Sequence, residues 1–181
     1  MRHLDQGRYV NRATNVAVCD DPAEFACSVA RHIRAVTKQA PAVREERWQS
    51  DDATTVSIDE YDYVRIPAVG VSLNGLFAVD GVPAESTHSG VHERRRLSAQ
   101  GQAILVCFEK TVLSNVEHVI AIGPLQYSLV AAVLHSGSNH YVTWTHCAGA
   151  DRVVDDSTVS STTLRNTNMH PRLGLYVLDN C

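Results

Sequence analysis

The stretch that decides the fold runs from Tyr127 to His146 and reads YSLVAAVLHSGSNHYVTWTH. An apolar run with strand-forming residues ends at His135, and a second β-rich run begins at His140. Connections this short join antiparallel neighbours in a sheet. The first run is apolar at consecutive positions, which is typical of a strand buried on both faces. The stretch therefore predicts two central strands of a mostly antiparallel sheet.

Further strand signals lie on both sides of this stretch. They are TTVSI at 54–58, YDYVRI at 61–66, AILVCF at 103–108, VEHVIAI at 116–122, DRVV at 151–154 and LGLYVL at 173–178. The segment 72–77, SLNGLF, predicts a short helix or turn. Residues 39–53 are polar and 80–101 are rich in charge and turn formers, so both are expected to be loops. The run Arg94–Arg96 is read as solvated surface, with a basic docking site as the alternative.

Residues 20–38 carry the best helix signal in the chain. Asp21 suits the N-cap, Pro22 the first helical position, and Glu24 completes a capping box. An apolar stripe follows at helical spacing and consists of Phe25, Val29, Ile33 and Val36. The fold class is therefore α+β, with one capped helix ahead of the sheet. We expect residues 1–19 to be a lead-in and 20–181 to form one domain.

Composition narrows the function classes. The 181 residues are 44% apolar and carry a net charge of −4, without the basic excess typical of nucleic-acid binding. No apolar run is long enough to cross a bilayer, and the N-terminus lacks a signal-peptide core. The five cysteines show no C-x-x-C spacing, which argues against a disulfide framework and a zinc ribbon. We expect a cytoplasmic or nuclear protein without metal or cofactor.

A histidine that starts one strand and an aspartate that ends the next can meet across a hairpin. His140 and Asp155 are so placed. The carboxylate would hold one ring nitrogen and leave the other free as a general base. Two alternatives stay open. Strand-end histidines are often structural or merely exposed. A metal site formed by four histidine and cysteine side chains is the other alternative, although their spacing matches no usual zinc pattern. These four are His135, His140, His146 and Cys147.

The same residues resemble the histidine box of ubiquitin-specific proteases, a family of papain-like cysteine deubiquitinases. The matching positions are Tyr127, Leu129, Ala132, Val133, His135, Gly137, His140, Tyr141, Asp155, Asp156, Ser157 and Val159. The helix start is similar to the family's Q-D-A-x-E-F-L box through Asp21, Glu24 and Phe25. The resemblance covers about 20–181, and it implies a papain-like palm: a mostly antiparallel sheet with one capped helix.

The resemblance also implies roles for the site residues. His140 would be the general base, Asp155 would orient it, and Asp156 would assist in polarising it. Asp156 is equally explained as a turn residue that bonds its own backbone.

Three further positions would contact the substrate. Asp21 would lie near the basic tail of ubiquitin, and Gly137 and Tyr141 would line the narrow channel for its Gly-Gly terminus. Asp21 is also fully explained as a helix cap, and Tyr141 as a half-buried strand aromatic.

The sequence departs from the family pattern in three places. The loop before His140 is shortened to Ser138-Asn139, and no C-x-x-C zinc ligands are present, so fingers at 44–60 would be reduced and metal-free. The family's cysteine box is not found. Cys27 and Cys19 are the alternative nucleophiles, because papain-like thiols lie near a helix N-terminus.

The sequence therefore predicts a divergent or truncated deubiquitinase-like domain without the thumb. It would bind ubiquitin or a ubiquitin-like protein. It would hydrolyse ubiquitin C-terminal bonds if a nucleophile completed the site, for example from a second chain. The alternative is an inactive, ubiquitin-binding pseudoenzyme.

Overall fold

The computed structural model describes residues 10–11, 16–17, 26, 29–31, 34, 36, 42–49, 54–66, 72–83, 93–109, 111–136 and 140–179. Strands dominate these ranges, as expected for an α+β palm. The strands are β1 (Val10–Asn11), β2 (Val16–Ala17), β3 (Val43–Gln49), β4 (Thr55–Tyr61), β5 (Val64–Ile66), β6 (Val82–Pro83), β7 (Glu93–Ala99), β8 (Ala103–Phe108), β9 (Val119–Ile122), β10 (Leu125–His135), β11 (Tyr141–Cys147), β12 (Ala150–Asp155), β13 (Thr158–Ser160) and β14 (His170–Leu178). The short helices are α3 (Leu73–Phe77) and the 3₁₀ turns η1 (Leu113–Asn115) and η2 (Leu164–Asn166).

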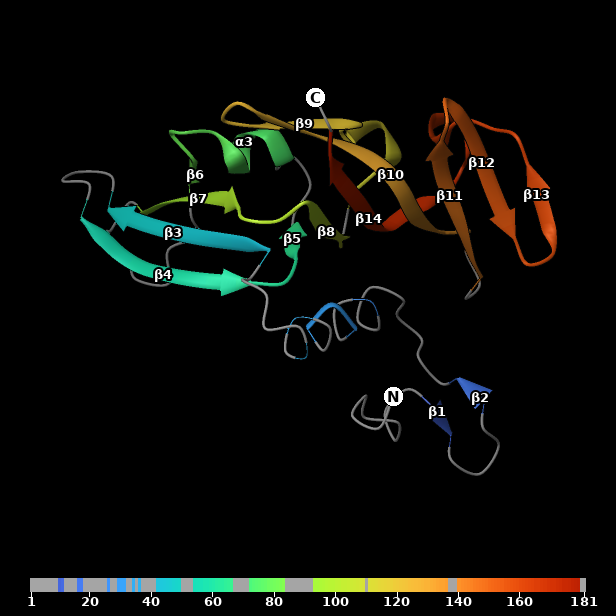
Figure 1. Cartoon of the computed structure of the whole chain (residues 1–181), viewed down its shortest axis with the longest axis horizontal. Helices are drawn as coiled ribbons and strands as arrows, with labels where there is room; N and C mark the ends of the chain where they lie inside the picture. The colour runs from blue at the N-terminus through green and yellow to red at the C-terminus, as the bar shows by residue number, and fades with distance from the viewer. Residues whose placement is uncertain are drawn as a thin grey trace.

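An eight-stranded sheet forms the larger part of the described structure. Its order is β13-β12-β11-β10-β14-β8-β5, and β9 pairs with β10 as a side branch. Neighbouring strands are antiparallel except β5 and β8, which are parallel. The prediction from the stretch 127–146 is confirmed, because β10 and β11 are adjacent antiparallel strands inside this sheet (Figure 1).

The long strand β10 contains an irregularity that keeps its apolar side chains in the core. Tyr127 and Leu129 are buried at alternate positions, and burial then resumes at Ala132 and Leu134. The pairing of β10 with β14 shifts register between Leu129 and Ala131. An extra residue in one strand changes the face to which later side chains point. The bulge thus explains why the sequence here is apolar rather than strictly alternating.

A second, four-stranded sheet has the order β4-β3-β7-β6 and lies beside the first (Figure 1). Its strands β3 and β7 fall in the segments 39–53 and 80–101, so the prediction of loops was wrong for 43–49 and 93–99. Charged residues in these strands face one another across the ladder, as Glu46 faces Arg96. Opposite charges in cross-strand pairs stabilise a sheet. In the sequence alone, the same charged residues favour the prediction of a loop.

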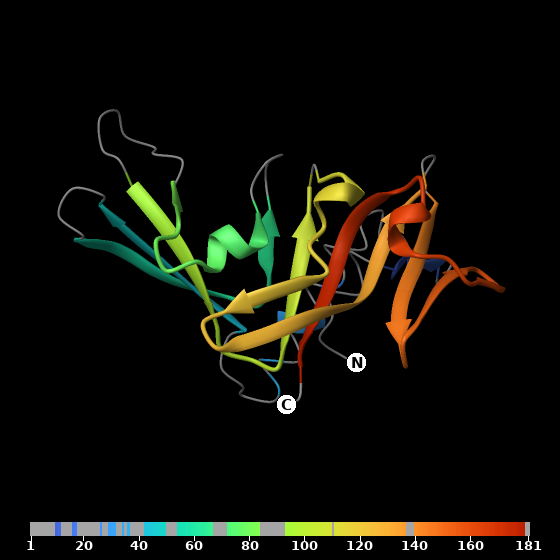
Figure 2. The same ribbon diagram turned by 90° about the horizontal axis from the view of Figure 1, so that it is seen from above.

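Helix α3 lies between the two sheets (Figure 2). Ser72 is its N-cap and accepts a hydrogen bond from the Gly75 amide at 2.9 Å. A carboxylate from a distant segment supplements this cap: Glu117 accepts from the amide of Leu73 at 2.6 Å and from the side chain of Asn74 at 2.8 Å. The first amides of a helix have no partner inside the helix. Glu117 therefore satisfies these donors and ties α3 to the segment before β9.

The predicted helix at 20–38 is described only in part. Ala26, Val29–Arg31, Arg34 and Val36 are helical, whereas the capping box lies outside the described residues. Ala26 packs against Cys107 and Leu173 on the eight-stranded sheet. Arg34 forms an ion pair with Asp62, in the turn between β4 and β5. Val36 is 67% exposed, so its expected place in an apolar stripe was wrong.

One core joins both sheets and α3. Val43 and Leu97 of the small sheet belong to the same buried cluster as Ile104 and Tyr127 of the large sheet. Among the helices that the structure describes, none has the length and apolar character needed to cross a membrane.

The core has no room for an added methyl group at Gly174. A Cβ there would lie 2.9 Å from Phe108 Cε2 and 3.2 Å from Leu129 Cδ1. We predict that Gly174→Ala lowers the free energy of unfolding by about 1–3 kcal/mol through overpacking. Chemical denaturation measures this. The control is Gly101→Ala, whose Cβ meets only ordinary contacts from 3.6 Å outward. Equal stability of the two variants would contradict the packing described.

The cap provided by Glu117 yields a second prediction. Glu117→Ala leaves the amides of Leu73 and Asn74 without their acceptor, so the free energy of unfolding should fall by about 2 kcal/mol. The control Glu60→Ala removes an exposed carboxylate from β4 and should change stability by at most about 0.5 kcal/mol. Thermal denaturation followed by circular dichroism compares them. A loss no larger than that of the control would show that the cap is not important.

Candidate functional site

The hairpin of β10 and β11 sets the position of His140. His135 pairs with Tyr141, and the amide of Ser136 donates to the carbonyl of His140 at 3.0 Å. His140 thus lies at the turn end of the hairpin, just before β11. Side chains alternate along a strand, so His140 shares a face with Val142 and Trp144. These two side chains are buried, at 2% and 1% exposure, and His140 is therefore at the rim of the core face.

The next hairpin brings Asp155 to the same rim. Thr143 pairs with Val154, so Asp155 at the end of β12 is opposite Val142 and diagonal to His140 on the same face. His140 Nε2 lies 2.6 Å from Asp155 Oδ1. The contact that the sequence predicted is present, on adjacent antiparallel strands. The two side chains are 43% and 48% exposed, so the pair is open to a ligand.

The geometry selects one tautomer of His140. A carboxylate accepts hydrogen bonds, so in the neutral ring Nε2 carries the proton and Nδ1 keeps a free lone pair. No side chain among the described residues bonds Nδ1. An imidazole oriented in this way can take a proton from a nucleophile that lies beside Nδ1.

Asp156 joins the pair because it leaves the strand in an unusual conformation. Its φ is 49°, in the left-handed region that tight turns use. A ring nitrogen of His140 and one carboxylate oxygen each of Asp155 and Asp156 all lie within 4.8 Å of one another. Asp156 is exposed and its carboxylate is near the imidazole, which is the arrangement that an assisting role requires.

The other expected site residues are only partly described. Tyr141 is half-buried, and its ring lies against His135 with centroids 4.9 Å apart. Its place next to His140 in sequence puts it on the opposite face of β11. Gly137 and Asp21 lie outside the described residues, so their expected substrate contacts remain predictions.

Cys107 and Cys147 lie in the described part of the chain, and neither can reach His140. Cys147 is at the far end of β11, seven residues away, which is about 23 Å at ~3.3 Å per residue. Cys107 is buried in β8, which β14 and β10 separate from β11, a spacing of about 14 Å. Cys19 and Cys27 lie outside the described residues.

The metal-site alternative named in the sequence fails in its original form. His140 and His146 lie at opposite ends of β11, about 20 Å apart at the usual rise per residue, so the four proposed ligands do not converge. His146 instead forms a second histidine–aspartate pair with Asp151, Nδ1 to Oδ1 at 2.6 Å. The spacing of five residues across the Ala148-Gly149 turn is the signal that predicts this pair, and sequence reasoning missed it.

Comparisons with known proteins agree on the fold. No protein-family model matches the sequence, and a search of curated proteins likewise gave no match. Solved structures do match. A SAGA DUB (deubiquitinase) module with a Ubp8 variant and a shortened Sgf11 is 11% identical, over 93% of this chain and 51% of that chain, with a TM-score of 0.62.

Two further solved structures give the same result. The Ubp8–Sgf11–Sgf73–Sus1 SAGA DUB module is 11% identical over 87% of this chain and 48% of that chain, with a TM-score of 0.61. A yeast SAGA DUB module with an Sgf73 variant is 12% identical over 81% and 44%, with a TM-score of 0.56.

This chain spans about half the length of the solved chains it matches. At this level of identity the likeness concerns the fold. The fold is that of the palm of a ubiquitin-specific protease, and the histidine–aspartate pair lies where β11 begins and β12 ends, at the strand ends of its sheet.

Proposed function

We propose that this chain is a deubiquitinase-like domain that binds ubiquitin or a ubiquitin-like protein and supplies the base and orienting acid of a thiol-dependent hydrolase. The observation that carries the proposal is the contact between His140 Nε2 and Asp155 Oδ1 within a fold of this kind. In the proposed reaction, His140 Nδ1 takes the proton of a thiol, and the thiolate adds to the carbonyl carbon at the ubiquitin C-terminus. The adduct then expels the leaving amine, which takes the proton from His140, and water hydrolyses the thioester that remains. Asp155 stabilises the imidazolium that forms, and Asp156 adds a second negative charge nearby.

The proposal requires a nucleophile that the described residues do not supply. Cys107 and Cys147 are both too far from His140 for proton transfer, which needs hydrogen-bond reach. The thiol would come from a second chain or from a segment outside the described residues. This feature also favours the second candidate, a ubiquitin-binding pseudoenzyme whose histidine–aspartate pair no longer takes part in catalysis.

Ubiquitin is the proposed partner because of what similar folds bind. One matching structure, a Ubp8/Sgf11/Sus1/Sgf73 DUB module bound to ubiquitin aldehyde, is 12% identical over 77% of this chain and 41% of that chain, with a TM-score of 0.56. In the proposed complex, the C-terminal tail of ubiquitin crosses the turn end of the hairpin, from Tyr141 on one face of β11 to His140 on the other. Asp21 would pair with a basic residue of the tail.

A ubiquitin probe with a thiol-reactive C-terminus tests the catalytic part. We predict that the 181-residue chain alone stays unmodified, because no thiol is held beside His140 in the described structure. Intact-mass spectrometry after incubation is the measurement. Stoichiometric labelling of Cys27 or Cys19 that His140→Ala abolishes would instead make this chain a complete protease.

Binding is tested with variants of one strand. We predict that Tyr141→Ala raises the Kd for ubiquitin by about tenfold, since truncation of an interface tyrosine typically costs more than 1 kcal/mol. The matched control is Thr143→Ala, an exposed position on the same face of β11, which should leave the Kd unchanged. Calorimetric titration with intact ubiquitin, and with ubiquitin lacking its Gly-Gly terminus, gives both values. Absence of any binding to intact ubiquitin would refute the proposed partner.

A further inference from the structure

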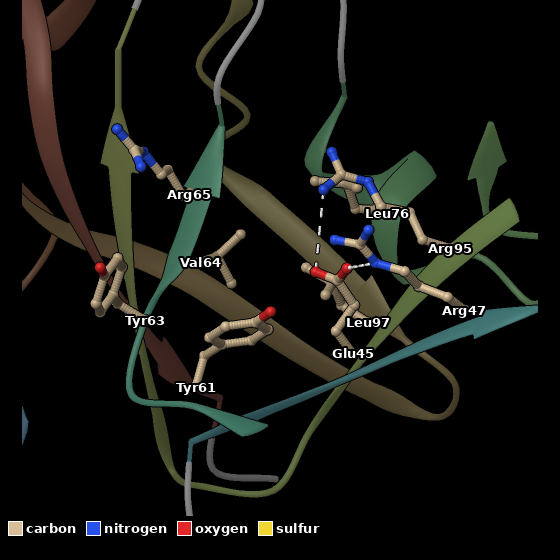
Figure 3. A pocket seen from close by; sticks show the side chains of 9 residues that line it. All are labelled: Glu45, Arg47, Tyr61, Tyr63, Val64, Arg65, Leu76, Arg95 and Leu97. Atoms are coloured by element: carbon tan, nitrogen blue, oxygen red, sulfur yellow. Dashed lines mark hydrogen bonds and ion pairs between the residues drawn. The ribbon is translucent and has the colours of Figure 1, made fainter. Parts of the chain in front are cut away.

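A cavity of about 280 Å³ lies between the two sheets, far from the histidine–aspartate pair in sequence (Figure 3). Its lining combines apolar residues with an unusual set of charges. The lining residues are Glu45, Arg47, Tyr61, Tyr63, Val64, Arg65, Leu76, Arg95 and Leu97. Most of them come from β3, β4, β5 and β7, the strands at the junction of the sheets.

Glu45 is the buried charged residue of the described core, with 6% of its surface exposed. Arg47 Nε donates to Glu45 Oε1 at 2.6 Å, and this hydrogen bond raises the pKa of Arg47. Arg95 approaches the other oxygen only to 3.9 Å, beyond hydrogen-bond range. One arginine is therefore well paired with Glu45 and the second is not.

Arg95 lacks the partners that a buried guanidinium needs. Its side chain is 19% exposed, and its Nε is buried without a hydrogen-bond partner among the described residues. A guanidinium has five donors, and a buried donor without an acceptor costs about 1–3 kcal/mol. The Nε–H is closed off from solvent, so an acceptor in the cavity would bond the terminal NH groups of Arg95. A carboxylate fits the planar fork of donors best.

The charge balance around the cavity favours an anion. Arg65 forms an ion pair with Glu109 and lies apart from the other two guanidinium groups (Figure 3). Arg47 and Arg95 together exceed the single charge of Glu45 by one. Asp59, the cross-strand neighbour of Glu45, is exposed to solvent, which weakens its charge at the cavity without removing it.

The remaining lining describes the body of the ligand. Burial, and next the negative charges of Glu45 and Asp59, raise the pKa of Tyr61, so its hydroxyl stays protonated and can donate. Figure 3 shows this hydroxyl directed into the cavity. Val64, Leu76 and Leu97 offer apolar contact. The volume is that of a small group, such as one branched aliphatic side chain with its acid.

We propose that this cavity binds a carboxylate with a short apolar body, held by the guanidinium of Arg95 and the hydroxyl of Tyr61. The carboxylate comes either from a free small acid or from an acidic side chain of a partner protein. The site is separate from the histidine–aspartate pair and does not depend on the proposed function.

Nuclear magnetic resonance of the arginine Nε–H groups in the 181-residue chain tests the proposal. Titration with 3-methylbutanoate should shift the Arg95 Nε–H resonance, whereas the neutral 3-methylbutanamide should not. A blocked peptide with one Glu beside Leu forms the second arm. A shift with the acid alone identifies a free acid as the source, and tighter binding of the peptide identifies a partner side chain. No shift of Arg95 in either arm would overturn the proposal.

Matched variants locate the effect. Arg95→Gln should raise the Kd of 3-methylbutanoate or of the Glu peptide, whichever binds, by at least about tenfold, because it removes a charge-assisted hydrogen bond. Arg96→Gln is the control, since Arg96 lies on the opposite face of β7 and bonds Glu46. If Arg95→Gln fails to fold, Tyr61→Phe replaces it and should weaken binding about threefold or more. Unchanged affinity in a folded Arg95→Gln or Tyr61→Phe variant would refute the site.

Discussion

The junction around Glu117 is the constraint on which the arrangement of the two sheets depends. Its carboxylate accepts from the first amides of α3, and its carbonyl accepts from the hydroxyl of Tyr176 in β14 at 2.7 Å. Burial raises the pKa of Tyr176, which keeps this hydroxyl a donor. Asn74 of α3 extends the junction, because its Oδ1 accepts from the Ala121 amide in β9 at 2.8 Å. Glu117 thus connects α3 to the central strand β14, and Asn74 connects α3 to the peripheral strand β9.

The histidine–aspartate pair depends on register rather than on this junction. The pairing of β11 with β12 places Asp155 diagonal to His140, and a slip by one residue would turn the two side chains to opposite faces. The buried side chains of Val142, Trp144 and Val153 hold that register, because they occupy the core face of the same hairpin. Packing in the middle of the hairpin therefore positions the polar groups at its end.

The parts of the fold that follow apolar patterns could be predicted from the sequence. The apolar residues of β10 and β14 are sufficient to predict that these strands are buried. The contact between His140 and Asp155 follows from the prediction of two strands and the turn that joins them. Strands β3 and β7 could not be predicted, since VREERWQ and ERRRLSA are polar when each is considered alone. Their stability comes from cross-strand pairs such as Arg96 with Glu46, which only the register reveals. The cavity at Arg95 could not be predicted for the same reason, because the sequences of its two charged strands predict loops.

The exposure of the histidine–aspartate pair has an evolutionary consequence. Side chains that are 43% and 48% exposed contribute little to folding, and an exposed ion pair is typically worth at most about 1 kcal/mol. A lineage can therefore replace either residue without losing the palm, whereas substitutions at buried positions such as Trp144 carry a folding penalty. Natural selection for the proposed hydrolysis and natural selection for the fold would act on different positions of one hairpin. A domain built in this way can drift between catalysis and simple recognition through single substitutions, while its architecture persists.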